Sequence, residues 1–264
     1  MAGLDLIGRI DMRERFKGKL VLVTGAAAGL GRGLALGFAA EGAELVLLDI
    51  EAAGLEETAR QVAAVGSSAE VHPINLGDEA AIHTFAEGFL SRHERLDVLI
   101  NNAGLAYGEI SSSFEALSQA KWLRYLSINT VAPLLLAQAL RPALAAASGV
   151  VLNQSSMAAN VPATAYGVTK AALNAMTYGM ATRFGADGIR VNAVAPGLME
   201  TPASVGQLSP EQFAGIRKMQ LLERQGTTDD IVRLHLFLAS EDASFITNEV
   251  VCCDGGNTRR GWRY

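Results

Sequence analysis

Segment 155–170 combines two hydroxyl side chains with a phenol and an amine, and these groups are suited to proton transfer. Ser155 and Ser156 precede a short loop, and Tyr166 and Lys170 follow it, four residues apart. On a helix this spacing places the phenol and the amine on one face. A nearby ammonium favours the phenolate, so Tyr166 can take a proton from an alcohol or return one to a ketone. For these two residues considered alone, the alternative is a partly exposed helical pair without chemistry.

A glycine-rich segment, TGAAAGLG at 24–31, follows the first apolar run directly and opens a helical pattern. Gly25, Gly29 and Gly31 permit a tight turn and a close backbone approach, and a helix N-terminus offers amides to a pyrophosphate. A turn that needs glycine for its geometry alone is the alternative. The segment predicts a dinucleotide site in the context of a strand and a helix.

Asp49 ends the second apolar run, 24 residues after Gly25. A carboxylate at this place accepts hydrogen bonds from a ribose diol and repels a 2′-phosphate. Ala28, Ile50 and Glu51 supply no cation for such a phosphate, and we expect Arg32 to be exposed. The pattern predicts NAD rather than NADP as the cofactor, with a turn-capping aspartate as the alternative.

Short apolar runs alternate with longer helical patterns and must position these groups. The runs cover 19–24, 44–49, 69–75, 96–102, 149–155, 189–196 and 249–256. Continuous apolar residues indicate strands buried on both faces, hence a mostly parallel, doubly wound α/β sheet. We expect residues 1–16 to be an N-terminal extension, 17–264 one domain, and about 198–227 a segment that covers the substrate.

Composition excludes several classes of protein. The net charge is −5 and no apolar run has the length of a membrane span, so we expect neither a nucleic-acid nor a membrane partner. The N-terminal residues lack the apolar core of a signal peptide, and Cys252 and Cys253 are neighbours in a strand, a poor geometry for a disulfide. The four histidines lack metal-ligand spacing and suit helix surfaces. We expect a soluble cytoplasmic protein without a metal site.

Several of these motifs occur together in one order. They are TGAAAGLG at 24–31, Asp49, NNAG at 101–104, Asn129, the serines with YGVTK, and the Pro196-Gly197 pair followed by Thr201. With them, the chain resembles the classical short-chain dehydrogenase/reductase family from about Lys17 to Gly256. The resemblance implies a Rossmann-type sheet of seven strands and a reaction on a bound nicotinamide dinucleotide.

The resemblance also implies roles for the residues that could do chemistry. Tyr166 corresponds to the general acid/base, and Lys170 to the residue that binds the nicotinamide ribose and lowers the tyrosine pKa. Ser156 corresponds to the hydroxyl that orients the substrate, although a loop about three residues shorter than in many relatives leaves Ser155 as an alternative. Asn129 corresponds to the residue that holds a water in the proton relay, with a local helix kink before Pro133 as the alternative.

The implied cofactor contacts extend along the carboxyl ends of the strands. The resemblance implies that the adenosine ribose lies along Asn102, Ala103 and Gly104. It also implies that the nicotinamide carboxamide is contacted by Pro196, Gly197, Leu198 and Thr201, with a simple strand exit as the alternative for the Pro196-Gly197 pair. Asn75 stands where the family usually has an aspartate for the adenine amino group, so we expect that contact to be weaker. The remaining expected cofactor residues are Gly25, Ala28, Gly29, Leu30, Gly31, Asp49, Ile50, Leu76, Tyr166 and Lys170.

These observations favour an NAD-dependent oxidoreductase that interconverts a secondary alcohol and a ketone. The covering segment is rather apolar, which suits a neutral, moderately apolar small molecule; it contains Phe213, Ile216, Met219, Leu221 and Leu222. The alternatives are a non-catalytic dinucleotide-binding regulator and an isomerase or dehydratase on the same fold. Helical segments 130–147 and 166–184 are rich in small residues on more than one face, which predicts a homotetramer or homodimer.

Overall fold

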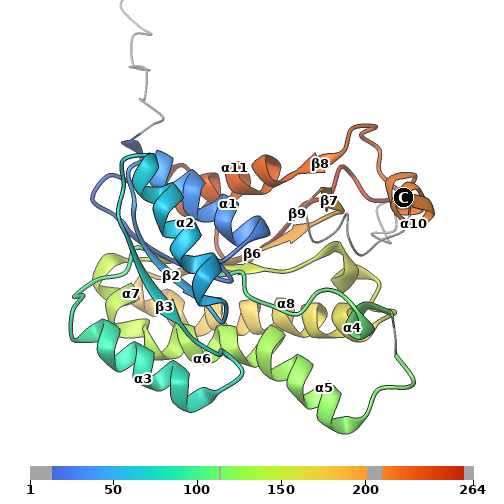
Figure 1. The fold of residues 1–264 in the computed structure, drawn as a ribbon, viewed down its shortest axis with the longest axis horizontal. Helices are drawn as coiled ribbons and strands as arrows, with labels where there is room; N and C mark the ends of the chain where they lie inside the picture. Colours follow the sequence, from blue (N-terminus) through green and yellow to red (C-terminus); the bar gives the residue numbers. More distant parts are fainter. Residues whose placement is uncertain (1–13, 113, 201–209, 259–264) are drawn as a thin grey trace, which may run out of the picture.

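A seven-stranded parallel sheet forms the centre of the protein (Figure 1). The computed structural model describes residues 14–112, 114–200 and 210–258. The strand order is β3-β2-β1-β4-β5-β6-β9. The strands are β1 Leu20–Thr24, β2 Glu44–Asp49, β3 Ala69–Pro73, β4 Val98–Asn101, β5 Val150–Gln154, β6 Arg190–Pro196 and β9 Val250–Cys253. Each lies within one of the apolar runs, which confirms the predicted doubly wound fold.

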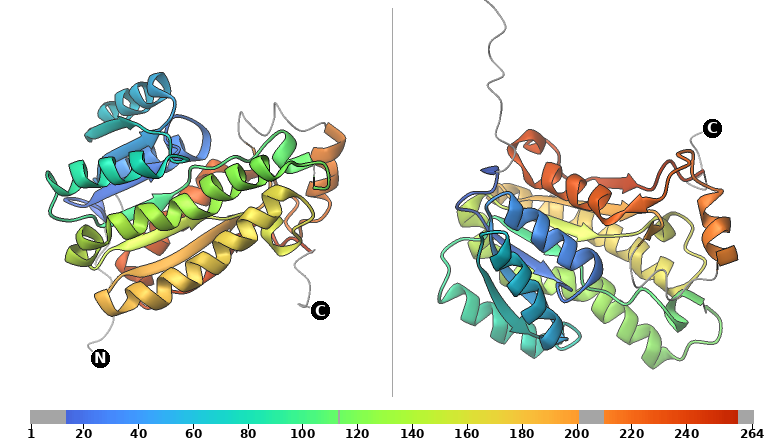
Figure 2. Two further views of the ribbon diagram at one scale, coloured as in Figure 1. Left: turned by 90° about the horizontal axis from the view of Figure 1, so that it is seen from below. Right: turned by 45° about the horizontal axis from the view of Figure 1, so that its top comes forward.

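Helices cover both faces of this sheet (Figures 1 and 2). One face carries α1 Gly29–Ala40, α2 Ala52–Ala64 and α11 Thr228–Ala239. The other carries α3 Glu79–Leu90, α6 Ala132–Ala139, α7 Arg141–Ala147 and α8 Ala165–Phe184. The shorter elements are α4 Glu109–Ser112, α5 Gln119–Leu126, α10 Pro210–Arg217, and the two-stranded sheet of β7 Met199–Glu200 and β8 Gly226–Thr227. The strand order reverses between β1 and β4, and the crevice at their carboxyl ends is where such folds bind ligands.

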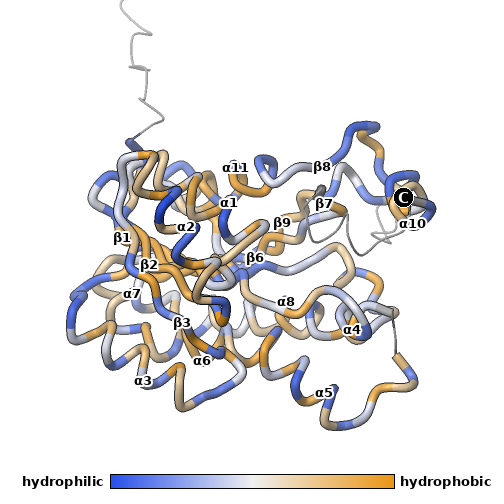
Figure 3. The backbone as a smooth tube through the Cα atoms, viewed as in Figure 1, coloured by the Kyte–Doolittle hydropathy of each residue, from blue (hydrophilic) through white to orange (hydrophobic). Residues whose placement is uncertain are grey.

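Burial on both sheet faces explains why the strands are continuously apolar. Along β5, Val150 and Leu152 pack with α1 and α11, whereas Val151 packs with α3, α6 and α8. Figure 3 shows the same hydrophobic character along the central strands and a mixture of hydrophilic and hydrophobic residues along the helices. The alternation also fixes which face each later residue of β5 occupies.

The domain includes residues before position 17, where the sequence predicted its start. Phe16 is 2% exposed and packs against Phe38, with ring centroids 4.7 Å apart. Arg15 forms an ion pair with Glu41 at 2.9 Å. The boundary of the expected extension at residue 16 is therefore corrected, because residues 14–16 belong to the domain; residues 1–13 lie outside the described ranges.

The helices of the described ranges differ from membrane spans in length or composition. No helix among them is by itself both long and apolar enough to cross a bilayer. The consecutive segments Gln119–Ala139 and Arg141–Ala147 meet the length and composition requirement only when taken together, and they are bent by 63°. Both belong to helices that pack on the sheet through residues such as Leu136 and Leu144.

Candidate active site

The glycine-rich turn is shaped by close backbone contacts between β1 and α1. Gly25 and Gly29 have φ angles of +67° and +55°, in the left-handed region. A β-carbon at Gly31 would lie 2.0 Å from the carbonyl oxygen of Gly25. Ala28 precedes α1 and offers no side-chain cap, so the first amides of the helix are not capped by a side chain. Position 31 of the turn therefore has room only for glycine.

Asn102 holds the turn against the end of β4. Its side-chain amide donates to the carbonyl oxygens of Thr24 at 2.9 Å and Gly25 at 3.3 Å. The Thr24 hydroxyl accepts hydrogen bonds from the backbone amides of Asn102 at 3.0 Å and Ala103 at 2.9 Å. These bonds fix segment 102–104 beside the turn, where the sequence predicted a cofactor contact.

Asp49 faces the turn from the end of β2. Its carboxylate accepts hydrogen bonds from the backbone amides of Ala27 at 3.0 Å and Glu51 at 3.1 Å. Arg32 is half-buried rather than exposed as predicted, because its guanidinium turns back onto the Thr58 hydroxyl at 3.0 Å and onto the Ala27 carbonyl. Asp49 therefore presents its negative charge beside the turn, while the guanidinium of Arg32 is occupied by hydrogen bonds within the chain.

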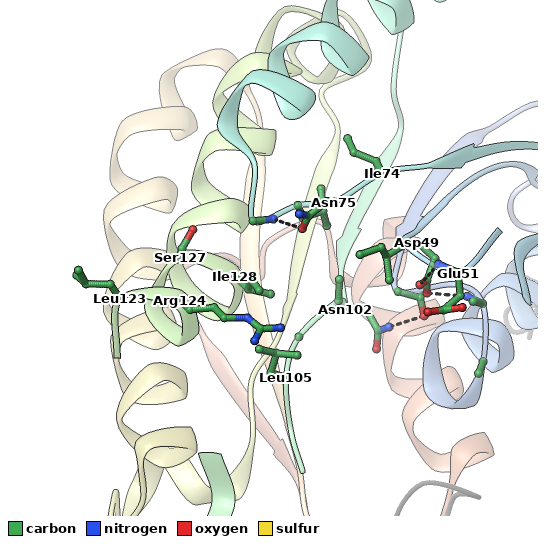
Figure 4. Close-up of a pocket in the computed structure, with 18 residues that line it drawn as sticks. Asp49, Glu51, Ile74, Asn75, Asn102, Leu105, Leu123, Arg124, Ser127 and Ile128 are labelled. Carbon is green, nitrogen blue, oxygen red and sulfur yellow. Dashed lines mark hydrogen bonds between the residues drawn. The ribbon is translucent and has the colours of Figure 1, made fainter. Parts of the chain in front are cut away.

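A cavity of about 790 Å³ lies in front of these residues (Figure 4). Nine predicted cofactor residues line it: Gly25, Ala28, Asp49, Ile50, Asn75, Leu76, Asn102, Ala103 and Gly104. Its opposite wall comes from α5 and the turn that follows, through Leu123, Arg124, Ser127 and Ile128, which the sequence reasoning missed. Figure 4 shows Arg124 reaching from this wall into the cavity. The spacing 123/127 and 124/128 marks one helix face and was the available signal.

Ser156, not Ser155, faces the tyrosine. Ser155 is 2% exposed, and its hydroxyl donates to Asn174 of α8 at 2.6 Å. The Ser156 side chain lies near enough to Tyr166 to lower the pKa of its phenol, and it accepts a hydrogen bond from the Ala158 amide at 3.2 Å. Consecutive residues leaving a strand point to opposite sides, so only one of the two hydroxyls can reach this site.

The protonation of Tyr166 differs from the sequence-based expectation. Burial raises the pKa of the phenol to about 12, its hydrogen bond with Ser156 opposes the rise, and the nearby Tyr107 adds to it. Lys170 is not among the groups that shift this pKa; its Nζ lies 5.8 Å from the ring centroid and donates to the Gln154 carbonyl. At neutral pH Tyr166 therefore carries its proton as a phenol.

Lys170 is buried beside the end of β5. The side chain is 3% exposed, and its Nζ donates to the backbone carbonyl of Gln154 at 2.7 Å. Burial lowers the pKa of the amine to about 8. No carboxylate forms an ion pair with Lys170 among the residues that the structure describes. The amine is therefore a cation whose charge is compensated mainly by dipoles.

Asn129 occupies a π-helical turn, Ser127–Val131, between α5 and α6. Its Oδ1 accepts from the Leu105 amide at 2.7 Å, and its Nδ2 donates to the Leu105 carbonyl at 2.9 Å and the Thr169 hydroxyl at 3.1 Å. A β-carbon at Gly104 would lie 3.1 Å from this Oδ1 and 3.5 Å from the Lys170 Nζ. The helix distortion and the polar position thus occur together, and the missing side chain at Gly104 leaves space between the amide and the amine.

The carboxyl end of β6 lies next to that of β5. Gly197 donates its amide to the Cys253 carbonyl at 2.9 Å, and the Leu198 carbonyl accepts from Gln225 at 2.9 Å. These bonds place predicted residues Pro196, Gly197 and Leu198 at the sheet edge that carries the catalytic groups. Thr201 lies outside the described residues.

The histidines do not form a metal centre within the described ranges, where no cluster of three or more potential ligands occurs. His235 corrects the predicted surface placement, because it is fully buried in α11 and its Nδ1 lies 2.9 Å from the Ile231 carbonyl. Burial lowers the pKa of its imidazole to about 4, so it is neutral at physiological pH. It is an internal packing residue of the helix that covers β6.

The chain is similar to known proteins over most of its length. A family model described as enoyl-(acyl carrier protein) reductase matches residues 25–258. A probable short-chain type dehydrogenase/reductase of Bradyrhizobium diazoefficiens is 35% identical over 247 residues, which cover 92% of this chain and 88% of that protein. The chain belongs to the classical short-chain dehydrogenase/reductase family. It is accordingly an oxidoreductase, as the sequence predicted.

Solved structures of short-chain dehydrogenases/reductases have the same fold. A 7α-hydroxysteroid dehydrogenase in complex with NADH and 7-oxo glycochenodeoxycholic acid matches with a TM-score of 0.86 and 29% identity, covering 93% of this chain and 96% of that one. The L-sorbose reductase of Gluconobacter frateurii, in complex with NADPH and L-sorbose, matches with a TM-score of 0.84 and 27% identity, covering 94% and 99%. Members of this family with a very similar fold thus bind either form of the dinucleotide.

Proposed function

We propose that this protein is an NAD-dependent oxidoreductase that interconverts a secondary alcohol and a ketone. One observation carries the proposal. Ser156, Tyr166 and Lys170 come together at the carboxyl ends of the strands, where the glycine-rich turn and Asp49 also lie. Both matched solved complexes contain a compound with a ketone group, a 7-oxo steroid and a ketose.

The residues at this edge suit a dinucleotide. The turn has room only for glycine at position 31, and the cavity before it is bordered by Asp49 and the backbone of Ala103 and Gly104. The nicotinamide would accept a hydride from the alcohol carbon or return it to the ketone. In this arrangement the first amides of α1 would bind the pyrophosphate, and Asp49 the ribose hydroxyls.

We assign the proton chemistry to three side chains. Tyr166 donates its phenolic proton to the oxygen of a ketone, and in the other direction it accepts the proton of the alcohol. Ser156, whose hydroxyl lies on the side of Tyr166, orients that oxygen. Lys170 binds ribose hydroxyls with its amine, and a water beside Gly104 would connect this amine to the Asn129 amide.

Asp49 supports NAD over NADP. A 2′-phosphate placed at Asp49 would be repelled by the carboxylates of Asp49 and Glu51, which both line the cavity. Arg32 could not compensate, because its guanidinium is hydrogen-bonded with Ala27 and Thr58. Ile50, 64% exposed beside Asp49, supplies no charge. Electrostatic repulsion at this short range favours the dinucleotide that lacks the phosphate.

An apolar wall beside Tyr166 supports a neutral, moderately apolar substrate. Tyr166 and Trp122 pack against a cluster that contains Ile110 and Tyr125. We propose that residues of about 198–227 cover this wall, with α10 at their centre, and that Arg217 and Lys218 form their exposed face.

We further propose that the protein is a cytoplasmic homo-oligomer. Exposed Tyr178 and Ala175 lie on α8, the helix that we propose as part of a homotetramer or homodimer interface. Cys252 and Cys253 are free thiols, which suits the reducing cytoplasm. One domain, which begins by residue 14 and not at residue 17, would then contain the whole catalytic apparatus.

A stoichiometric assay tests the proposed function. Purified protein is incubated with a panel of secondary alcohols and either NAD or NADP at alkaline pH, and both nicotinamide absorbance and ketone are measured. One NADH formed per ketone, with NAD preferred, is the expected result. Binding without turnover across the panel would instead favour a regulator, and product formation without net NADH an isomerase or dehydratase.

A further inference from the structure

Gln154 is a buried amide without a partner, directly at the proposed catalytic site. It is the last residue of β5, it precedes Ser155, and its side chain is 5% exposed. Neither its Nε2 nor its Oε1 makes a hydrogen bond within the part of the chain that the structure describes. An unsatisfied buried polar group is costly, so a native protein that keeps two on one side chain needs a reason for them.

The pleat of the sheet places this side chain toward the cofactor. Val150 and Leu152 of β5 face the layer of α1 and α11, so Gln154 continues that row. Its register partner on β6 is Val194, and Pro196 follows two residues later on the same face. On β4, Ile100 is paired with Leu152, so Asn102 lies level with Gln154. The amide therefore lies between the nucleotide turn on one side and segment 196–198 on the other.

Neighbouring groups restrict what can reach it. The backbone carbonyl of Gln154 accepts the hydrogen bond of Lys170, the residue proposed to bind the nicotinamide ribose. Segment 196–198, proposed to contact the nicotinamide carboxamide, begins on the adjacent strand. A group between these two contacts belongs to the nicotinamide end of the dinucleotide.

We infer that the Gln154 side chain is a cofactor-positioning residue that forms an amide-to-amide hydrogen-bonded pair with the nicotinamide carboxamide. A primary amide offers donors and an acceptor, and a carboxamide offers the complementary set. The pair satisfies both orphaned atoms at once and fixes the rotation of the carboxamide. The inference rests on the proposed nicotinamide cofactor and adds a side-chain contact from β5.

Gln154→Met tests this contact, because methionine has a similar length and no amide. We expect the variant to bind NAD about fivefold more weakly, the size of one or two net hydrogen bonds. Acetylpyridine adenine dinucleotide replaces the amide by a methyl ketone and lacks the N–H that Oε1 would accept. The analogue keeps the carbonyl that would accept from Nε2, so its binding to the variant should weaken only about twofold. Calorimetry measures all four dissociation constants.

Thermal stability without cofactor provides a second readout that catalysis does not affect. Removing two unsatisfied polar atoms should raise the melting temperature of the ligand-free variant by about 3 °C. Gln119→Met is the matched control, because Gln119 is exposed at the start of α5 and should change neither binding nor melting.

The outcomes separate this inference from the proposed function. A wild-type protein that binds neither NAD nor NADP would overturn both. Wild-type binding together with unchanged NAD affinity in Gln154→Met would overturn the inference alone. The same holds for equal losses with NAD and the analogue, or for a lowered melting temperature, which would mean that the amide is already satisfied without cofactor.

Discussion

In the part of the cleft formed by the glycine-rich turn, Asp49 and Asn102, which we call the nucleotide half, these polar side chains have partners within the chain. Asp49 accepts two backbone amides, and Asn102 donates to two backbone carbonyls. The catalytic half is formed by Gln154, Ser156, Tyr166 and Lys170. Its buried polar groups are not fully compensated by partners within the chain. The Gln154 amide has no partner among the described residues, and burial shifts the pKa of Tyr166 upward and that of Lys170 downward.

The difference separates two ways of preparing a site. The nucleotide half is rigid before a ligand arrives, so binding there costs little rearrangement. The catalytic half keeps groups in electrostatically unfavourable states, and a charged or hydrogen-bonding ligand would relieve them. Perturbing each half should therefore have different consequences.

Tyr166→Phe should give the largest effect, a fall in kcat of about a thousandfold, because the variant cannot transfer the proton. NADH affinity should stay within about twofold, since the nucleotide half is untouched. Steady-state rates and fluorescence titration measure the two quantities. Tyr178→Phe, on the exposed side of the same helix, is the control that should retain full activity. Substantial turnover by Tyr166→Phe would refute the assigned role.

Gly31→Ala should damage the nucleotide half instead. The added β-carbon would meet the Gly25 carbonyl oxygen at 2.0 Å, so the turn must shift, with a loss of about 3 kcal/mol in unfolding free energy. Urea unfolding measures the loss, and weaker NADH binding should accompany it. Gly88→Ala, where the nearest neighbour is an Arg92 side-chain atom at 3.5 Å, should be at least as stable as the wild type. Similar stability of both variants would show that the turn is not tightly packed.

Lys170→Met should stabilise the ligand-free protein by about 2 kcal/mol at pH 7. Burial lowers the pKa of Lys170 from 10.5 to about 8, a cost of roughly 3 kcal/mol for the charged form, against about 1 kcal/mol for the lost hydrogen bond. Below pH 8 both wild-type states carry the proton. Between pH 8 and 10.5 the folded state releases it first, so wild-type stability rises and the advantage of the variant shrinks.

Urea unfolding at a series of pH values from 7 to about 10 follows this difference. Lys218→Met, at an exposed position, is the control and should show no pH-dependent difference from the wild type. A constant gap between Lys170→Met and the wild type across the range would contradict the buried-charge explanation.

Asp49→Asn should have the smallest effect, about a tenfold rise in the ratio of kcat/KM with NADP to that with NAD. Asparagine keeps an acceptor for the Ala27 amide and removes only the charge that repels the 2′-phosphate. Glu44→Gln, exposed at the opposite end of β2, should leave the ratio unchanged. An unchanged ratio in Asp49→Asn would mean that another group reads the ribose.

Local sequence patterns were sufficient to predict where the strands lie and in which order the motifs follow them. The apolar run at 44–49 coincides with β2, because a strand buried on both faces leaves a continuous signature. The spacing of Tyr166 and Lys170 likewise placed both on α8. Such features depend on neighbours along the chain, which a sequence displays directly.

Features that depend on contacts between distant residues could not be predicted in this way. The choice of Ser156 over Ser155 depends on Asn174 of α8 accepting the Ser155 hydroxyl. The retracted position of Arg32 depends on Thr58 of another helix. The raised pKa of Tyr166 depends on burial, which the one-turn spacing from Lys170 does not reveal. Each of these required the packed structure.

The most direct test of the account is the ionisation of Tyr166 with and without the oxidised dinucleotide. Phenolate absorbance of the wild type minus that of Tyr166→Phe isolates this one tyrosine during a pH titration. We predict no phenolate difference below about pH 10 for the ligand-free protein, and a clear difference below pH 10 once NAD with its positive nicotinamide is bound. Identical titrations in both states would contradict the claim that the catalytic half is completed by its cofactor.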